Sequence, residues 1–357
     1  AFKNIGPGII YAVTFFLILR ALMGKTEWLL MSLIVLLPLR NVIEKLHVLP
    51  LGKDFLDILF FILILGTLVR KVQSKSAIIS RSPISTLALI MISYMFVSLF
   101  IGSSYLGNDV IFDISDTRVQ AWKNFCLMPI LFLITLNTVN DKKWVWRTVL
   151  IMCVTMAVMD TYLVRQISWF SNIESRVKIH GTFVYLGPNE VSAFYNQYTI
   201  LLLGLFFSMK KSFTKINLLG LILINLFCVL FLFSRAAYLG LAVGMFFIFS
   251  IKNKKLLIPL LLVIIYWQVA LPQKVQERIL ETTNAYGELD ESSEARLIIW
   301  QNAIDLFYEN PIAGVGFGVF SKLGFRLGDT HNIYVKILAE QGVVGLFMFL
   351  LLLFVLF

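Results

Sequence analysis

Charged residues are scarce in this sequence. Only 15% of the 357 residues are Asp, Glu, Lys or Arg, whereas a typical soluble domain has about 25%. Hydrophobic residues make up 59% and include 31 Phe. A globule of this size cannot bury so much apolar surface, so much of it must face lipid. The composition excludes a cytosolic enzyme, a nucleic-acid-binding domain and a disordered chain. The net charge of +10 is therefore interpreted first as a membrane feature.

Cysteine is also rare. Cys126, Cys153 and Cys228 lie in separate apolar stretches, form no CxxC pair and have no histidine at metal-ligand spacing. We predict that they are small buried hydrophobes, with no disulfide framework and no bound metal. The chain begins with Ala and stops inside an apolar run at Phe357, so we expect further sequence at its ends.

Long apolar runs recur along the chain, and most are near the roughly 20 residues that a spanning helix needs, although the first two are short and weak. We predict spans over residues 9–23, 28–40, 54–70, 83–101, 124–140, 146–164, 190–209, 215–233, 235–251, 255–271 and 332–357. The stretch 216–251 would make a helix about 54 Å long, against a bilayer core of about 30 Å. It must therefore form two helices with a hairpin near Ser234–Arg235. The predicted fold is an all-α, polytopic transmembrane bundle of about 11–12 spans, forming a single membrane domain over residues 1–357.

Positive charge in short loops predicts the orientation of these spans. Lys and Arg gather in four loops, at 70–81, 142–147, 210–215 and 252–255, which fall at every second gap, as cytoplasmic loops should. The remaining gaps then face outward, and the longest of them, 272–331, is predicted to carry amphipathic helices. If all three N-terminal segments span, residue 1 lies outside. Whether a first helix is missing or 9–23 is not a full span stays open.

Cations on the outer side run counter to the positive-inside rule. Arg235 lies on the predicted hairpin between two apolar helices, where it either marks a helix end by snorkelling or binds an anion. Arg176 lies in the second outer loop, where it belongs either to an ordinary basic surface or to an anion site. These two arginines are therefore candidate ligands of a charged substrate.

The best amphipathic helix of the long loop begins near Arg296. Ser292 or Ser293 can cap it, and Asn310-Pro311 ends it. Arg296 borders the apolar stripe, which places its guanidinium at headgroup level unless it pairs with a local acid such as Glu294. The predicted apolar stripe consists of Leu297, Trp300, Ile304 and Phe307.

The segment after this helix carries a glycine cluster and a histidine. Gly314-Val315-Gly316-Phe317-Gly318 is either a tight turn, which we favour, or a backbone amide nest for an anion. His331 stands where the loop joins the final helix, whose positive dipole end favours a neutral imidazole. A lone histidine is often structural, but a neutral one can accept a proton near pH 7. Glu340 lies on roughly the opposite face of the helix and is a poor partner for it.

These residues resemble the motifs of the O-antigen ligase and polymerase superfamily. The matching segments are Arg296 to Gly318 through Trp300 and Pro311, His331-Asn332-Ile333-Tyr334, Glu340-Gln341-Gly342-Val343-Val344-Gly345-Leu346, Ser234-Arg235-Ala236-Ala237-Tyr238-Leu239-Gly240, and Gly181-Thr182-Phe183 with Pro188-Asn189. Each motif alone is weak, but their order along residues 176–350 is fairly specific.

The resemblance implies a bundle of about a dozen helices in the bacterial inner membrane. Such a protein transfers a glycan from undecaprenyl diphosphate at the periplasmic face, with inversion and with neither metal nor cofactor. The family's pair of arginines corresponds to Arg235 and Arg296, and its essential histidine to His331. Arg176 is predicted to bind substrate at the mouth of the site. The other predicted substrate-binding residues lie in the matched motifs and are Gly316, Asn332 and Tyr334.

The acceptor is left open. We favour the ligase, whose acceptor is the lipid A-core, over the polymerase, which joins lipid-linked repeat units. The ten residues between Arg176 and Gly187 resemble a polymerase loop motif. A transporter or flippase is a third possibility, although Asp160, one of the few acids within a span, lies near the outer end of that span. The predicted partners are the lipid-linked donor, the glycan or lipid A-core acceptor and membrane lipid, with no nucleic acid.

Overall fold

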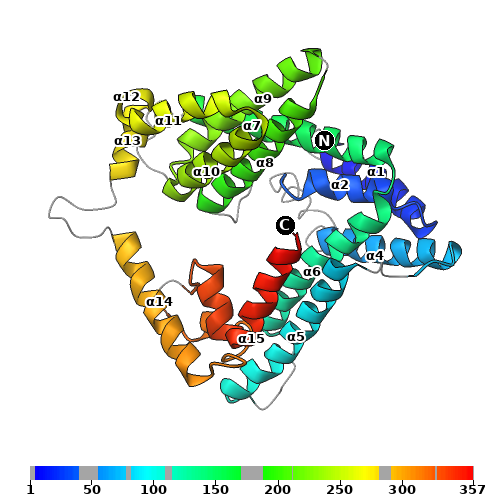
Figure 1. The fold of residues 1–357 in the computed structure, drawn as a ribbon. Helices are drawn as coiled ribbons and strands as arrows, with labels where there is room; N and C mark the ends of the chain where they lie inside the picture. Colours follow the sequence, from blue (N-terminus) through cyan, green and yellow to red (C-terminus); the bar gives the residue numbers. More distant parts are fainter. Residues whose placement is uncertain are drawn as a thin grey trace. The chain divides into compact units, whose positions relative to one another are not determined.

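The computed structural model describes residues 5–39, 55–77, 82–108, 115–169, 188–210, 212–280, 291–325 and 328–356. Every regular element in these ranges is a helix (Figure 1), so the predicted all-α class is confirmed. The α-helices are α1 (Ile5–Leu22), α2 (Glu27–Leu36), α4 (Phe55–Gln73), α5 (Pro83–Tyr105), α6 (Thr117–Thr138), α7 (Lys142–Trp169), α8 (Pro188–Ser208), α9 (Ser212–Phe231), α10 (Arg235–Lys252), α11 (Leu257–Ile265), α12 (Trp267–Ala270), α13 (Gln273–Leu280), α14 (Glu291–Glu309) and α15 (Ile333–Leu356). Two short 3-10 helices are η3 (Lys254–Leu256) and η4 (Phe320–Lys322).

The helices have the length and composition of a polytopic membrane protein. Among the described residues, seven helices are long and apolar enough to cross a membrane by residue count and composition alone, namely α5, α6, α7, α8, α9, α10 and α15, the last of which is bent. Helices α1 and α2 contain shorter apolar stretches. The hairpin predicted near Ser234–Arg235 is confirmed, because α9 ends at Phe231 and α10 begins at Arg235.

The segment predicted as one span over residues 255–271 is not one continuous helix. Here η3, α11 and α12 follow one another, and the nine residues of α11 reach about 14 Å, well short of a bilayer core of about 30 Å. Pro259 explains the start of α11, because proline fits the first turn of a helix but not its interior. The helix is interrupted again at Tyr266, whose φ of −100° and ψ of 31° are not helical.

The chain divides into two compact units. Unit 1 comprises residues 1–66 and 141–282, and unit 2 comprises residues 67–140 and 283–357. In unit 1, helix α8 packs mainly against α9 and α10. The core of this unit is formed by apolar side chains of α7 to α10, among them Met156, Met159, Tyr195, Cys228 and Leu232.

In unit 2, helices α5 and α14 both pack on α15. The core between α14, the glycine segment and α15 contains Ile299, Ala303, Leu306, Val315, Val319, Phe320 and Ala339. Helix α14 ends before Asn310-Pro311 as predicted, but it begins at Glu291, ahead of both predicted caps.

The face that α14 buries lies beside the predicted apolar stripe. The side chains that this helix buries deepest are Ala295, Ile299, Ala303 and Leu306. Leu297 is 51% exposed, whereas Trp300, Ile304 and Phe307 lie at intermediate depth. The small Ala295 and Ala303 let α14 approach its neighbours closely, and the larger residues that suggested the stripe flank the contact.

Helix α15 is not one straight span. Gly342 interrupts it with a φ of 65° and a ψ of −165°. The ring centroids of Tyr334 and Phe349 are 5.9 Å apart, although 15 residues of straight helix would separate them by about 22 Å. The chain therefore turns back at Gly342, and Figure 1 shows the two arms side by side. The predicted straight span over 332–357 is corrected to two arms that meet at a buried turn.

Candidate functional site

The turn at Gly342 exchanges its helical hydrogen bonds for bonds to the segment after α14. In a continuous helix, the amides of residues 343 and 344 would donate to the carbonyls of residues 339 and 340. Instead, four backbone bonds join the two segments: Val315 N to Ala339 O (3.0 Å), Gly316 N to Glu340 O (2.9 Å), Val343 N to Pro311 O (2.9 Å) and Val344 N to Ile312 O (3.3 Å). Every opened helical group named here thus finds a partner, as buried backbone polar groups require.

Two glycines permit this close packing. Gly316 has a φ of 110° and lies against the backbone of Gly102, where any side chain would collide. Gly342 has a φ of 65°, and a side chain there would collide with the carbonyl of Ile312. The amides of Val315, Gly316 and Phe317 all donate within unit 2. The glycine cluster is thus a packed turn, and this geometry offers no support for substrate binding by Gly316.

The side chain of Glu340 connects the turn at Gly342 to η4 through a hydrogen bond. Its side chain is 2% exposed, and its Oε1 accepts a hydrogen bond from the amide of Phe320 at 3.2 Å. Ser98 Oγ and the amide of Gly316 both donate to the Glu340 carbonyl. Glu340 therefore has a structural role between α5, η4 and α15.

His331 lies directly before the first turn of α15, as predicted. The side-chain oxygen of Asn332 caps the helix by accepting from the amides of Tyr334 (3.1 Å) and Val335 (3.4 Å). His331 has a φ of 50° and an exposed side chain. A left-handed backbone costs a non-glycine residue about 1–2 kcal/mol. The fold therefore holds the imidazole outside the packed core in a strained conformation.

Asp329 and Lys336 close this corner with an ion pair of 2.7 Å. Burial alone would raise the pKa of the Asp329 carboxyl. The hydrogen bond and charge of Lys336, with smaller contributions from His331 and the Thr330 amide, outweigh burial and lower that pKa below its ordinary value.

Trp300 connects α14 to the His331 corner. Its Nε1 donates to the carbonyl of Thr330, the residue before His331, at 2.9 Å. Arg296 lies one turn earlier on the same face of α14. The structure thus brings Arg296 and His331 to the same end of the α14–α15 pair.

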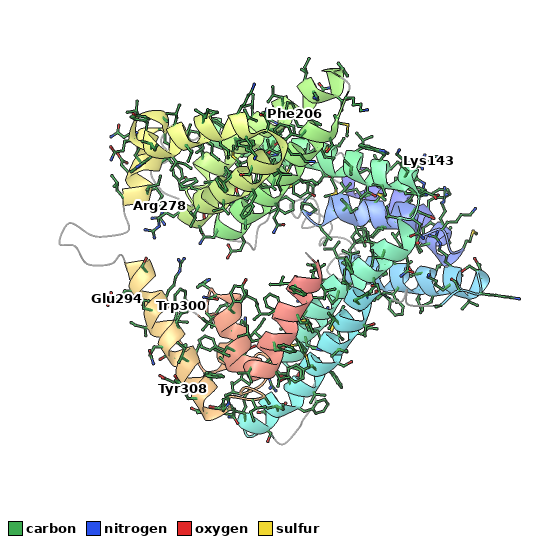
Figure 2. All side chains as sticks on the ribbon, in the orientation of Figure 1. Lys143, Phe206, Arg278, Glu294, Trp300 and Tyr308 are labelled. Atoms are coloured by element: carbon green, nitrogen blue, oxygen red, sulfur yellow. The ribbon has the colours of Figure 1, made fainter. Side chains whose placement is uncertain are left out.

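Arg296 is half-buried. Throughout the described part of the chain, it forms no ion pair or hydrogen bond. In particular, it does not pair with Glu294, which is exposed (Figure 2). A guanidinium in this situation keeps its N–H groups available to an anion.

In unit 1, two of the matched sequence segments meet. Ser234 Oγ, immediately before α10, donates to Asn189 Oδ1 in the first turn of α8 at 2.8 Å, across 45 residues of chain. Arg235 is the first residue of α10 and is half-buried. The fold thus places Asn189 of the second-loop motif beside the arginine motif.

A cavity of about 530 Å³ lies between α8 and α10 next to this contact. Five of its lining residues are small or apolar (Ala193, Ile200, Ala236, Ala237 and Gly240), and four are polar (Asn189, Asn196, Gln197 and Ser234). Arg278 of α13, which we did not predict from the sequence, donates from Nε to the Phe233 carbonyl at 3.3 Å in the same α9–α10 turn. Arg278 is thus a second cation near Arg235.

The comparison with known families supports the resemblance over the C-terminal part of the chain. Residues 220–350 match the family model described as O-antigen ligase. The resemblance to the O-antigen ligase and polymerase superfamily is therefore confirmed. No curated protein and no solved structure matches the chain.

The O-antigen ligase match extends from α9 to α15 and includes Arg235, Arg296 and His331. Arg235 belongs to unit 1, whereas the other two belong to unit 2, so their joint action stays a prediction. Arg176 lies outside the described residues. Asn332 caps α15, and Tyr334 is exposed beside Phe349.

Arg118, at the start of α6, is a buried cation that sequence reasoning missed. It is 3% exposed, and its Nε and Nη2 contact Asp116 Oδ2 at 2.8 and 2.7 Å. Nη2 also donates to Ser103 Oγ. A side chain at Gly318 would collide with the Arg118 stem. Arg118 therefore supports the glycine turn of the O-antigen ligase domain from outside residues 220–350.

Asp116 holds this cluster together. Burial alone would raise its pKa, but the hydrogen bonds from Arg118 and the charges of Arg118 and Lys322 outweigh burial and lower the pKa. Lys322 of η4 lies 3.4 Å from Asp116 Oδ1. The rule that singled out outward arginines would also have found Arg118, because it lies in the predicted outer gap 102–123.

Proposed function

We propose that this protein is a bacterial inner-membrane glycosyltransferase that acts at the periplasmic face. It takes a glycan from undecaprenyl diphosphate and attaches it to an acceptor, which as an O-antigen ligase is the lipid A-core. The observation that carries the proposal is the position of Arg296. Within the matched region, this arginine lacks an ion-pair or hydrogen-bond partner among the described residues and lies at the His331 end of α14 and α15.

The proposed reaction is a displacement at the anomeric carbon of the donor sugar. The acceptor oxygen forms a bond to that carbon, while the bond from the carbon to the diphosphate oxygen breaks with inversion. The acceptor proton passes to His331, whose exposed imidazole can reach a bound substrate. The electron pair of the broken bond stays on the leaving diphosphate.

The arginines stabilise the diphosphate as its charge grows. Arg296 and Arg235 each offer a planar fork of N–H donors that fits phosphate oxygens and stays charged at any relevant pH. Fixed cations of this kind stabilise a transition state strongly. Since the arginines supply the positive charge, the proposed reaction needs no metal, and EDTA should leave the rate unchanged. Arg176 would bind sugar or phosphate at the mouth of the site.

The polymerase is the alternative, since the spacing of Arg176 and Gly187 resembles a polymerase loop. The same arginines and histidine would then act on a lipid-linked repeat unit as acceptor. Glycolipids from a cell lacking the gene separate the two activities. Loss of a ligase leaves lipid-linked polymer that never reaches lipid A, and this is the result we expect. Single repeat units attached to lipid A would instead establish the polymerase.

The second alternative is a transporter or flippase, and substitution of Asp160 distinguishes it from a glycosyltransferase. This acid is buried in α7, and a transporter would be expected to use such an intramembrane carboxyl. We expect Asp160→Asn to leave glycan transfer intact. Substrate-dependent ion flux in vesicles that Asp160→Asn abolishes and Arg296→Ala does not affect would instead favour a transporter.

A further inference from the structure

Arg147 of α7 is held against two tryptophans in unit 1. Its guanidinium carbon lies 4.6 Å from the Trp144 ring centroid and 5.4 Å from that of Trp28 in α2. The two rings meet edge to face, with centroids 5.5 Å apart and an interplanar angle of 82°. Cation–π contacts of this kind fix the guanidinium through the ring faces and occupy none of its N–H groups.

The N–H groups of Arg147 remain available for a ligand. Within the ranges that the structure describes, Arg147 makes neither a hydrogen bond nor an ion pair with protein. A preoriented guanidinium with free N–H edges matches two oxygens of one phosphate group. Arg147 therefore has the form of an anion site that none of the described residues of unit 1 fills.

The N-terminal ends of α2 and α7 add to the positive charge around Arg147. Trp28 contacts Trp144, and one turn further along both helices Thr148 Oγ1 contacts Met31 Sδ at 3.5 Å. The contacts advance in the same direction, so α2 and α7 are parallel and both begin at this corner. Their N-terminal dipole ends attract an anion.

The side chains around the corner have an excess of positive charge. Lys25, Lys142 and Lys143 are exposed and, like Arg147, have no acidic partner among the described residues. The acids here are Glu27 and Asp141, in or beside the first turns of α2 and α7. Four cations thus face two acids, and the corner stays cationic.

The next part of α7 has the surface of a lipid-facing helix. Val145, Trp146 and Leu150 expose apolar side chains beside this cationic corner. Tryptophan and basic residues together mark the boundary between hydrocarbon and headgroups. An anion bound to Arg147 would therefore lie at headgroup depth.

We propose that Arg147, seated on Trp28 and Trp144, binds the phosphate of an anionic phospholipid. The site comprises Arg147 with Lys142 and Lys143 at the start of α7 and Lys25 before α2. None of these residues belongs to the set proposed for glycan transfer. Its role is to tie the α2–α7 corner to the headgroup layer of one leaflet.

Native mass spectrometry of the purified full chain tests this proposal. The probes are phosphatidylglycerol and phosphatidylcholine of identical acyl chains, and the readout is the fraction of protein that keeps one lipid. We expect wild type to retain phosphatidylglycerol preferentially. Arg147→Gln should weaken retention about tenfold, because a hydrogen-bonded charge is lost. Arg147→Lys should retain phosphatidylglycerol less well than wild type and better than Arg147→Gln, because lysine keeps the charge but loses the planar fork of N–H donors.

Trp144→Leu and Lys252→Gln complete the experiment. Trp144→Leu keeps the charge of Arg147 but removes its support, so it should weaken retention with a normal melting temperature. Lys252→Gln removes an exposed cation at the end of α10 and should have no effect. Equal retention of both lipids by wild type, or wild-type retention by Arg147→Gln, overturns the proposal. Displacement of the lipid by millimolar orthophosphate would assign the site to a soluble phosphate and also overturn it.

Discussion

At the scale of single residues, the structure separates cations that hold the fold from cations that are available to a substrate. Arg118 is buried and bonded to Asp116 and Ser103. Arg296 has no such bonds among the described residues, although both arginines lie in gaps between spans that were predicted to face outward. The sequence alone could not separate these roles, because the partners of Arg118 come from another helix and from the residues before its own.

The proposed bidentate contact between the Arg296 guanidinium and the donor diphosphate can be tested directly. We predict that Arg296→Lys lowers the transfer rate about 100-fold, because lysine keeps the charge but loses bidentate contact with the diphosphate. Glu294→Gln on the same helix should behave as wild type. Both variants should insert and melt normally, because neither side chain bonds to the described protein. Full activity of Arg296→Lys would rule out the diphosphate-clamp role.

His331→Gly separates catalysis from folding at one position. Removing the imidazole should lower the transfer rate about 10²–10⁴-fold, the usual contribution of a general base. The same change relieves the left-handed backbone at φ 50°, so the free energy of unfolding should stay equal or rise by about 1 kcal/mol. Thermal melting and transfer by the same preparation provide the comparison. A stable, fully active variant would remove His331 from the site.

The Asp116–Arg118 pair makes stability depend on pH. Because the pKa of Asp116 is lowered in the fold, the pair contributes stability above the ordinary carboxyl pKa and loses it as pH falls through the folded value. Asp116→Asn should cost about 3 kcal/mol at pH 7, since it leaves a buried guanidinium without its counterion. The difference from wild type should shrink below about pH 4, as melting curves would show. A difference that does not change with pH would contradict this account.

At the scale of elements, apolar runs predict most helices but not how they bend. The break near Ser234–Arg235 followed from length, because a mostly apolar stretch of 36 residues (216–251) is too long to cross a bilayer once. The turn at Gly342 could not be predicted in this way, because glycine is common in membrane helices and the residues that follow Gly342 are apolar. Its turn depends on partners about 25 to 30 residues earlier, Pro311 to Gly316. The buried face of α14 was not predicted, because alanine contributes little to a hydrophobic pattern yet permits the closest packing.

The turn at Gly342 should tolerate no side chain. Gly342→Ala is expected to destabilise the protein by about 2 kcal/mol or more, because its backbone conformation is nearly unique to glycine and the new methyl would meet the Ile312 carbonyl. The matched control is Gly220→Ala in α9, which has open space around it and should gain about 0.5–1 kcal/mol. Melting temperatures in detergent measure both. Equal melting temperatures for the two variants would contradict the buried turn.

At the scale of the whole molecule, the account requires two units to serve one reaction. Arg235 stands at the start of α10 in unit 1, while Arg296 and His331 occupy one corner of unit 2. If both arginines hold the same diphosphate, their substitutions cannot act independently. Residues that work as a group show strongly non-additive losses.

The most direct measurement is transfer by purified protein in EDTA, with undecaprenyl-diphosphate glycan as donor and lipid A-core as acceptor. Wild type, Arg235→Ala, Arg296→Ala and the double variant are compared. We predict that glycan moves to lipid A-core with wild type, that each single change lowers the rate about 100-fold or more, and that the double variant is little worse than either. A fully active single variant, losses that simply multiply, or inhibition of wild type by EDTA would contradict the account.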